Sequence, residues 1–206
     1  MKKIAVIVLC ITTLCVTNAS AQEKALHFRF GAEWGLTATL FEHHHFNYFE
    51  KNLGYRVNER IDALKLFPNA CAEIFIGTDI GRKWNLSLRG GIAGYLSDLF
   101  FPLKVRATLT PAGSDRDGWL WYAEGGPMLG RRLGGDPDFA GCGGIGAGYR
   151  VSPGGRTAID FTLSLRSTLS HPQIIDEESG APLPAENIGR ANRVCTALSF
   201  SISLSF

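Results

Sequence analysis

The stretch Leu198-Ser-Phe-Ser-Ile-Ser-Leu-Ser-Phe206 alternates apolar and hydroxyl side chains with a strict period of two. Successive side chains of a β-strand point to opposite faces, so the apolar residues share one face and the serines share the other. The apolar face is made by Leu198, Phe200, Ile202, Leu204 and Phe206. The stretch therefore predicts a strand with one apolar and one polar side.

The other end of the sequence predicts export. Met1-Lys-Lys is followed by a short apolar run over 4–16 and by Ala19-Ser-Ala21. These are the three parts of a secretory signal peptide, which we place at 1–21. The apolar run is shorter than the roughly 20 residues that a membrane-spanning helix needs. We therefore expect the mature chain to begin at Gln22 and to lack a helical anchor.

The remaining residues, 22–206, show no shift in composition that would separate two domains, so we expect a single domain. The formal net charge is only +2, and no basic stripe is present. Such a chain lacks the electrostatic field that draws proteins to nucleic acid, and we expect no nucleic-acid partner.

Turn-forming residues divide the mature chain into runs of alternating polarity, each about long enough to cross a bilayer as a tilted strand. The expected strands are 26–40, 69–80, 84–94, 99–110, 119–131, 139–151, 157–169 and 193–206. Short turns alternate with longer connections, of which 41–68 and 170–192 are the longest. This alternation of connection lengths is typical of outer-membrane barrels.

Within the expected strands, large apolar side chains share one face and charged side chains share the other. The charged face carries Arg29, Glu33, Glu73, Asp79, Arg89, Lys104, Arg106, Glu124, Arg150, Asp160 and Arg166. A cation facing lipid at the bilayer centre costs about 2–4 kcal/mol, so lipid contact would enforce this segregation. Alternation alone also fits a soluble barrel with the apolar face inside.

Aromatic residues and glycines decide between the two orientations. Several rings fall near one end of the apolar face, where interfacial aromatic residues of a membrane barrel are expected: Phe28, Trp84, Trp119, Trp121 and Tyr149. Glycines such as Gly144 and Gly146 accompany long charged side chains on the other face. An eight-stranded interior is only wide enough for side chains, so glycine on one wall leaves room for arginine from another.

The chain thus resembles the small eight-stranded outer-membrane barrels typified by the membrane domain of OmpA and by OmpX. The resemblance implies an all-β, eight-stranded, antiparallel, closed transmembrane β-barrel with a polar, side-chain-filled lumen. It also implies Sec-type export to the outer membrane of a Gram-negative bacterium, with outer-membrane lipid as a partner. In that family, the barrel-assembly machinery reads a terminal strand such as 198–206.

The lumen charges predict a plug. Ionised groups in a narrow bore must pair with each other, because an unpaired buried charge is prohibitively unstable. We expect a salt-bridge network made of Arg29, Glu33, Glu73, Arg89, Lys104, Arg106, Glu124, Arg150, Asp160 and Arg166. An ion pathway or gate is the alternative function of the same residues.

Three other signals are weaker. The histidines of His43-His-His45 could contribute metal ligands, with His43 and His45 as candidates, but consecutive side chains point to different sides. Apolar residues at helical spacing predict a short helix over 58–66. Cys71, Cys142 and Cys195 lie too far apart across the expected strands for a disulfide, which leaves them as lumen-filling thiols.

A non-enzymatic role follows as the main hypothesis, carried out by the outer loops 41–68 and 170–192 through adhesion, surface binding or envelope integrity. We expect no catalytic residues and no cofactor. A lipid A-modifying enzyme is the first alternative, with Ser170 and His171 beside Asp176 and Glu177 as its candidates. An accessory subunit of an envelope transport complex is the second.

Overall fold

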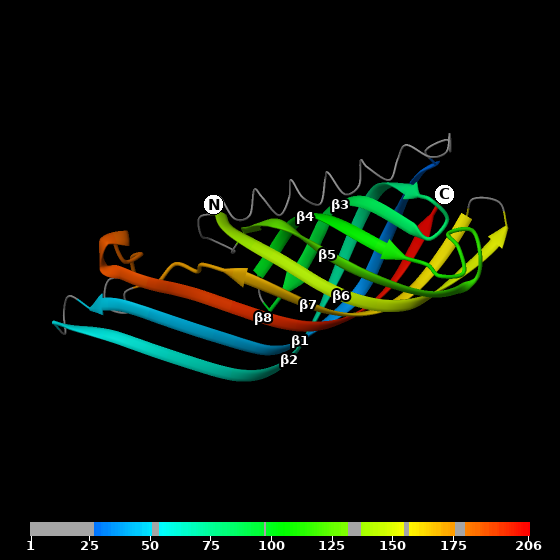
Figure 1. The fold of residues 1–206 in the computed structure, drawn as a ribbon. Coiled ribbons are helices and arrows are strands. Elements are labelled where there is room, and N and C mark those ends of the chain that lie inside the picture. The colour runs from blue at the N-terminus through cyan, green and yellow to red at the C-terminus, as the bar shows by residue number, and fades with distance from the viewer. Residues whose placement is uncertain (1–26, 51–53, 97, 132–136, 155–156, 176–179) are drawn as a thin grey trace.

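The computed structural model describes residues 27–50, 54–96, 98–131, 137–154, 157–175 and 180–206, and the expected signal peptide at 1–21 lies outside them. Eight β-strands follow one another around a closed barrel (Figure 1). Their bounds are β1 His27–Glu50, β2 Tyr55–Ile80, β3 Trp84–Tyr95, β4 Asp98–Leu109, β5 Gly118–Arg131, β6 Pro137–Gly154, β7 Thr157–Ser170 and β8 Ile188–Ser205. The prediction of an eight-stranded antiparallel barrel is confirmed.

The barrel closes where the first strand meets the last. β1 pairs with β8 in an antiparallel register that runs from Gly31 opposite Ser205 to Tyr48 opposite Ile188. The backbone of Phe206 also exchanges two hydrogen bonds with Phe30, at 2.9 and 3.2 Å. Closure satisfies the backbone groups of both terminal strands, which would otherwise form exposed sheet edges.

The apolar face of the strands points outward and the charged face points into the lumen. Ile145 and Trp119 on the outside are 66% and 63% exposed, whereas Arg106 and Glu33 inside are 2% and 1% exposed. This orientation is opposite to that of a soluble barrel, whose apolar residues are enclosed. Of the two orientations compatible with the alternation, the molecule adopts the one with charges inside.

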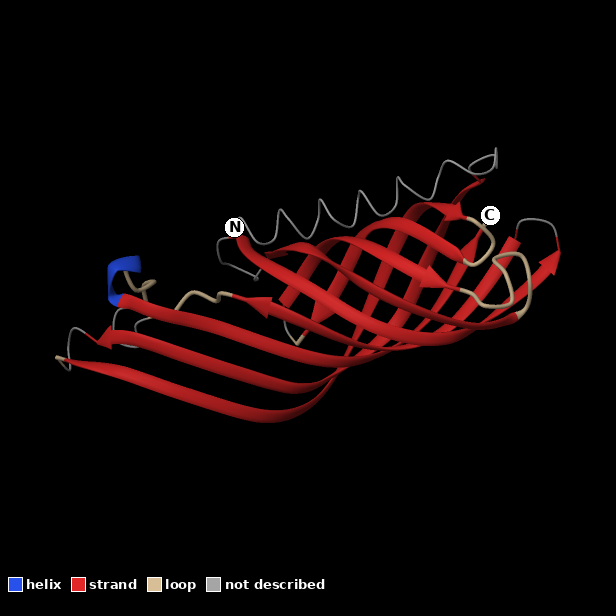
Figure 2. Cartoon of the chain, viewed as in Figure 1, coloured by secondary structure: helices blue, strands red, loops and turns tan. Residues whose placement is uncertain are grey.

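Three strands continue far beyond the barrel. We call the part formed by 41–50 of β1, 55–67 of β2 and 188–192 of β8 the extension, and the end of the barrel from which it rises the extension end (Figures 1 and 2). The opposite end, where β2 connects to β3, β4 to β5 and β6 to β7, is the turn end. The extension is a three-stranded antiparallel sheet with β1 in the middle.

The extension corrects two predictions about residues 41–68. Residues 41–50 belong to β1 and 55–68 to β2, so these described residues are not a loop, and 58–66 are not helical. Ile61 and Leu64 have helical spacing, yet β1 supplies a continuous row of partners from Glu50 opposite Tyr55 to Phe41 opposite Leu64. Tertiary pairing with β1 therefore overrides the weak local preference for a helix.

The second long connection is also shorter than expected. β7 ends at Ser170 and β8 begins at Ile188, directly after a 3₁₀ turn over Ala185–Asn187. Between them, Ile175 and Pro182 form an isolated antiparallel bridge. Among the described residues, no helix is long and apolar enough to cross a membrane.

Candidate functional site: the lumen and the extension

Glu33 of β1 is the centre of the lumen charges. Its two carboxylate oxygens accept hydrogen bonds from three guanidinium groups: Arg89 at 2.7 Å, Arg106 at 2.6 and 3.0 Å, and Arg166 at 2.8 Å. These arginines come from β3, β4 and β7, so the contacts cross the bore instead of joining neighbouring strands. Charge-assisted bonds of this kind are among the stronger hydrogen bonds in proteins.

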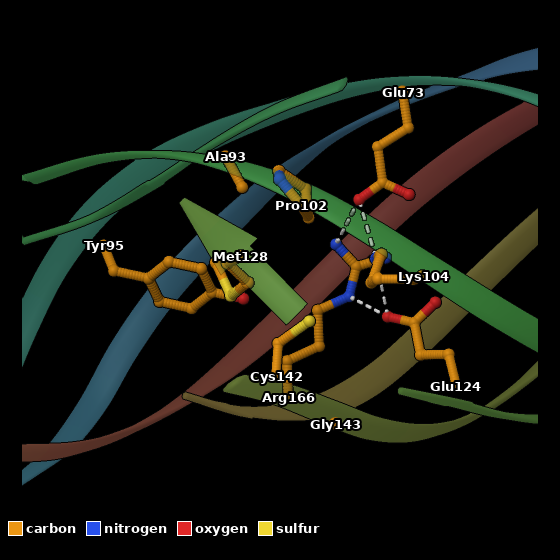
Figure 3. Close-up of a pocket in the computed structure, with 10 residues that line it drawn as sticks. All are labelled: Glu73, Ala93, Tyr95, Pro102, Lys104, Glu124, Met128, Cys142, Gly143 and Arg166. Carbon is orange, nitrogen blue, oxygen red and sulfur yellow. Dashed lines mark hydrogen bonds and ion pairs between the residues drawn. The ribbon is translucent and has the colours of Figure 1, made fainter. Parts of the chain in front are cut away.

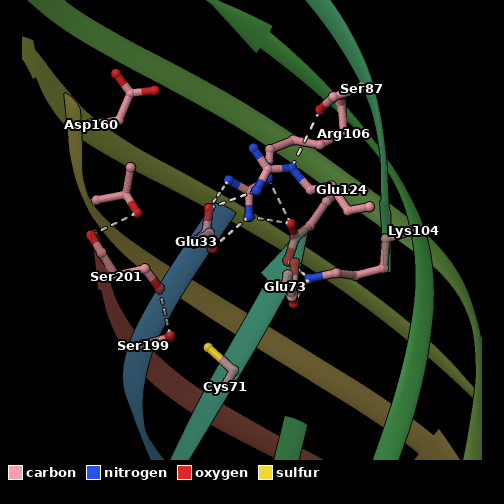
Figure 4. Close-up of polar contacts among 12 residues, drawn as sticks. Glu33, Cys71, Glu73, Ser87, Lys104, Arg106, Glu124, Asp160, Ser199 and Ser201 are labelled. Carbon is pink, nitrogen blue, oxygen red and sulfur yellow. Dashed lines mark hydrogen bonds and ion pairs between the residues drawn. The ribbon is translucent and has the colours of Figure 1, made fainter. Parts of the chain in front are cut away.

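Two more carboxylates complete the central cluster (Figure 4). Glu124 accepts from Arg106 Nε at 2.8 Å and from Lys104 Nζ at 2.9 Å, and it lies 3.2 Å from Arg166 Nε. Glu73 lies 2.7 Å from Lys104 Nζ. Lys104 thus bridges Glu73 and Glu124, and Arg106 bridges Glu33 and Glu124. The cluster fills the lumen at mid-height with interlocked ion pairs.

The cluster contains four cations and three carboxylates, and aromatic rings stabilise two of the cations. The guanidinium carbon of Arg89 lies 4.2 Å from the centre of the Phe75 ring, and that of Arg106 lies 4.0 Å from the centre of the Tyr122 ring. A cation over a ring face is attracted by the negative face of the π-system. Phe75 and Tyr122 therefore compensate part of the excess positive charge.

Glycine makes this stacking possible. Gly146 is the cross-strand partner of Tyr122, and a Cβ placed on Gly146 would lie 2.5 Å from the Tyr122 ring. Gly31 has the same relationship to Phe75, also at 2.5 Å. The glycines thus make room for a ring on the adjacent strand. The sequence predicted that Gly146 would make room for arginine from another wall, and this was wrong, because the space beside Gly146 is occupied by the Tyr122 ring.

A second group of ion pairs lies at the turn end. Arg29 Nε donates to Asp79 at 2.8 Å, and Arg150 forms a bidentate pair with Asp160 at 2.7 and 2.8 Å. Both arginines also donate to the main-chain carbonyl of Ser114, at 3.3 and 2.8 Å. Ser114 belongs to the turn between β4 and β5, so this turn folds under the lumen and covers its end.

Toward the extension end, the lumen changes from charged to apolar. Tyr95, Phe100 and Met128 are buried there together with smaller residues, and Tyr95 packs edge-on against Phe100 at 5.9 Å between ring centres. A void of about 10 Å³ separates this layer from Lys104 and Glu73 (Figure 3). A second void, of about 20 Å³, lies near Arg150. Each has room for about one water molecule.

The aromatic residues predicted for a membrane interface lie outside the barrel and toward its turn end. Their exposures are 65% for Phe28, 50% for Trp84, 63% for Trp119, 48% for Trp121 and 42% for Tyr149. Trp119 and Tyr149 are cross-strand partners in a T-shaped contact. The five side chains come from β1, β3, β5 and β6. In the terminal strand, Phe206 packs against Phe30 at 5.7 Å.

The histidines lie on β1 in the extension and alternate between its two faces. His43 pairs with Asp62, and His45 Nε2 lies 3.1 Å from Asn58 Oδ1 on the same face. His44 is on the other face, 2.5 Å from Glu42. In the described part of the chain, no three histidine, cysteine or acidic side chains converge as metal ligands. The histidines connect β1 to its neighbouring strand or to Glu42 of β1 itself.

The residues named for a lipid-modifying enzyme are not brought together. The Ser170 hydroxyl is buried and accepts from Arg193 Nε at 3.3 Å, whereas His171 is exposed and its Nδ1 donates to the Ala191 carbonyl at 3.0 Å. Asp176 and Glu177 lie outside the described residues. A nucleophile needs a base within hydrogen-bond reach, and Ser170 and His171 use different partners.

Cys71, Cys142 and Cys195 are free thiols. Cys71 and Cys195 are buried toward the extension end of the lumen, where Arg166 Nη1 lies 3.3 Å from Cys71 Sγ. Cys142 donates to the Gly126 carbonyl at 3.3 Å. The three thiols fill lumen space between larger side chains.

Sequence reasoning missed several contributors to the lumen. Phe75 and Tyr122 share the strand face of Glu73 and Glu124 and lie opposite glycines, a signal that was available. The sequence carried no signal for Ser114, because its carbonyl reaches Arg29 and Arg150 only through the path that the β4–β5 turn takes in the folded barrel. The Arg193–Asp98 pair, which joins β8 to β4 near the extension end, was missed for the same kind of reason.

No protein-family model matches the sequence, and neither does the sequence of a curated protein. Two solved structures are similar in shape. Neisserial surface protein A is 10% identical with a TM-score of 0.45, over 87% of this chain and 99% of that one. The outer membrane protein OprG from Pseudomonas aeruginosa is 10% identical with a TM-score of 0.48, over 89% and 97%. At this identity and TM-score, no function is transferred from these proteins to this chain. Its architecture is established by its own strand pairing.

Proposed function

We propose that the chain is a small outer-membrane β-barrel of a Gram-negative envelope that is closed to solutes and acts, without catalysis, through its extension as a surface-binding module. In this proposal the apolar outer face contacts membrane lipid, and the extension projects outward from the cell. Sec-type export and recognition of 198–206 by the barrel-assembly machinery belong to the same proposal.

The observation that carries the proposal is the apolar belt. Leu and Ile side chains at mid-barrel are half or more exposed, among them Ile74, Leu103, Ile145 and Leu163. Soluble monomers rarely expose a continuous apolar surface of more than a few hundred Å², because water does not solvate it favourably. A belt that runs around all eight strands fits hydrocarbon, and the aromatic side chains near the turn end fit the adjoining interface.

The lumen contacts support a plug and not a pore. Glu33 is 1% exposed and Arg106 is 2% exposed, and their ion pair crosses the bore. The voids on either side have room for about one water molecule each. A conducting pore needs a continuous wet path, which these contacts interrupt.

The extension supports the binding role. It places three strands in an ordered sheet away from the barrel, with polar and apolar side chains on both faces. Binding surfaces on a rigid scaffold lose little conformational entropy when a partner binds. Ser170 and His171, the two candidate catalytic residues that the structure describes, form hydrogen bonds to different residues and not to each other. This favours a binding role over lipid hydrolysis.

Electrophoretic mobility of the purified outer-membrane fraction tests the location. A folded barrel migrates differently before and after boiling, so we expect a heat-dependent shift of this protein in that fraction. Its absence from the outer membrane would overturn the proposal. Conductance in planar bilayers then distinguishes plug from pore, and release of acyl chains from labelled lipid A would reveal an enzyme.

A further inference from the structure

The outer strand of the extension has a free edge. β2 pairs with β1 along its whole length, but its pairing with β3 begins only at Cys71 opposite Ala93. No other strand among the described residues lies along the second side of 55–67 (Figure 2). Alternate backbone N–H and C=O groups on that side are therefore available for another strand.

This edge is long and regular. From Tyr55 to Leu64 the register with β1 is continuous, and the irregularity between β1 and β2 occurs only closer to the barrel, at Thr39/Phe41. No proline interrupts 55–67. Ile61 and Leu64 are 42% and 68% exposed. Natural sheets usually shorten, bulge or cover such an edge, because it is a template for strand addition.

The charges on this edge are self-complementary in one arrangement. If a second copy of β2 runs antiparallel and Ile61 faces Ile61, then Arg60 faces Asp62 of the second copy and Asp62 faces its Arg60. Residues 58–64 then contain no like-charge pair, since Glu59 faces Ala63 and Asn58 faces Leu64. Directly opposed side chains on one face of a sheet interact, and opposite charges there are favourable.

The parallel arrangement has the opposite property. An in-register parallel pair puts Glu59, Arg60 and Asp62 each against the same residue of the second copy, and like charges directly opposite are destabilising. Asp62 is available for the antiparallel pair because its side chain is 81% exposed although it contacts His43. The charge pattern therefore selects antiparallel over parallel pairing.

We propose that the extension binds a second copy of this chain by antiparallel pairing of β2 with β2 about a two-fold axis at Ile61. The inference rests on the proposed function, since it names the partner of the surface-binding module. Such an isologous contact joins two three-stranded extensions into one six-stranded sheet, with the same surface used by both copies.

The geometry then places the two barrels in different membranes. Antiparallel strands run in opposite directions, so the barrels lie at opposite ends of the shared sheet. From Ile61 to the barrel at Ala70 is nine residues in each copy, which at about 3.4 Å per residue separates the barrel rims by about 60 Å. Two copies in one membrane have parallel β2 strands, which the charges disfavour. The pairing is thus an adhesive contact between apposed cells.

Clustering of proteoliposomes tests the proposal. The full mature chain is reconstituted into phosphatidylcholine vesicles, and clustering is followed by light scattering and by energy transfer between two differently labelled vesicle populations. We expect wild-type vesicles to cluster, and to cluster less at high salt, because exposed ion pairs are screened. Many weak contacts between two vesicles act together, so modest affinity per pair suffices.

Two charge variants give a matched control. Arg60→Asp makes the edge acidic and Asp62→Arg makes it basic, so vesicles that carry either variant alone should not cluster. When the two kinds of vesicle are mixed, each Asp faces an Arg again and clustering should return. A folding defect would not be restored by mixing, and a heat-dependent mobility shift verifies that each variant forms a barrel.

The outcomes separate this inference from the proposed function. Three results would each overturn the pairing of β2 with β2. Wild-type vesicles do not cluster, vesicles with either variant alone cluster, or the mixed variant vesicles do not cluster. If in those cases the protein still resides in the outer membrane and shifts on heating, the proposed location and barrel stand. If the barrel itself is absent from that membrane, the proposed function fails first.

Discussion

Arg106 on β4 binds Glu33 on β1 through both of its terminal nitrogens, at 2.6 and 3.0 Å, across the lumen. The same guanidinium donates through Nε to Glu124 at 2.8 Å and stacks on Tyr122. Nearly every polar group of Arg106 thus has a partner inside the barrel. The arrangement makes the central cluster of the lumen an interlocked unit in which each member depends on its neighbours.

Replacing Glu33 should strongly destabilise the barrel. Glu33→Gln removes the negative charge shared by Arg89, Arg106 and Arg166, and breaking a buried pair from one side costs about 3–5 kcal/mol. The unfolding midpoint in urea, followed by the heat-dependent mobility shift in lipid vesicles, measures the effect. Glu59→Gln makes the same change on the exposed extension and should leave the midpoint unchanged. Equal midpoints for Glu33→Gln and wild type would contradict the central role of Glu33.

Adding one methyl group to Gly146 should disturb the Arg106 stack. The new Cβ would lie 2.5 Å from the Tyr122 ring, so the ring must move, and overpacking of this kind costs about 1–3 kcal/mol. Gly141→Ala on the same strand is the control, since its Cβ meets nothing within 4 Å. Urea unfolding of the two variants should separate them, and the proposed glycine–ring packing fails if both behave alike.

A cation introduced on the apolar belt should lower the stability of the barrel far more than a cation introduced on the extension. Leu163 at mid-barrel and Tyr55 at the tip of the extension are both 54% exposed. Leu163→Arg should lower stability in a bilayer by about 2–4 kcal/mol, because the guanidinium faces hydrocarbon, and Tyr55→Arg should have little effect. Folded fractions in vesicles at increasing urea concentration give the comparison. Similar, small effects at both positions would argue against lipid around the barrel.

Removing both members of the central pair should open a path for ions. In the double variant Glu33→Ala, Arg106→Ala, the small voids beside Arg89 and Lys104 should join and admit water. We expect single-channel openings in planar bilayers from this variant and none from wild type. The matched double variant Glu59→Ala, Arg60→Ala lies in the extension and should stay closed. Wild-type channels would show that the ion pairs do not seal the lumen.

The sequence by itself determined the number of barrel strands and the face on which each charge lies. Both are local properties: side chains alternate along any strand, so Arg89, Lys104 and Glu124 had to share the face opposite the leucines. The bounds of β3, β4, β5 and β7 differ from the expected ones by a residue at either end at most, because turn-forming residues on both sides limit them.

Only the tertiary structure decided which charges meet and how far three strands extend. Glu33 binds Arg166, which is 133 residues away along the chain, because closure of β1 on β8 sets the relative height of every strand. Residues 41–50 and 55–67 are strands and not a loop with a helix because they pair with each other and because β8 pairs with the other side of 41–48. A strand is maintained by hydrogen bonds to its neighbours, and neighbours distant in sequence leave no local signal.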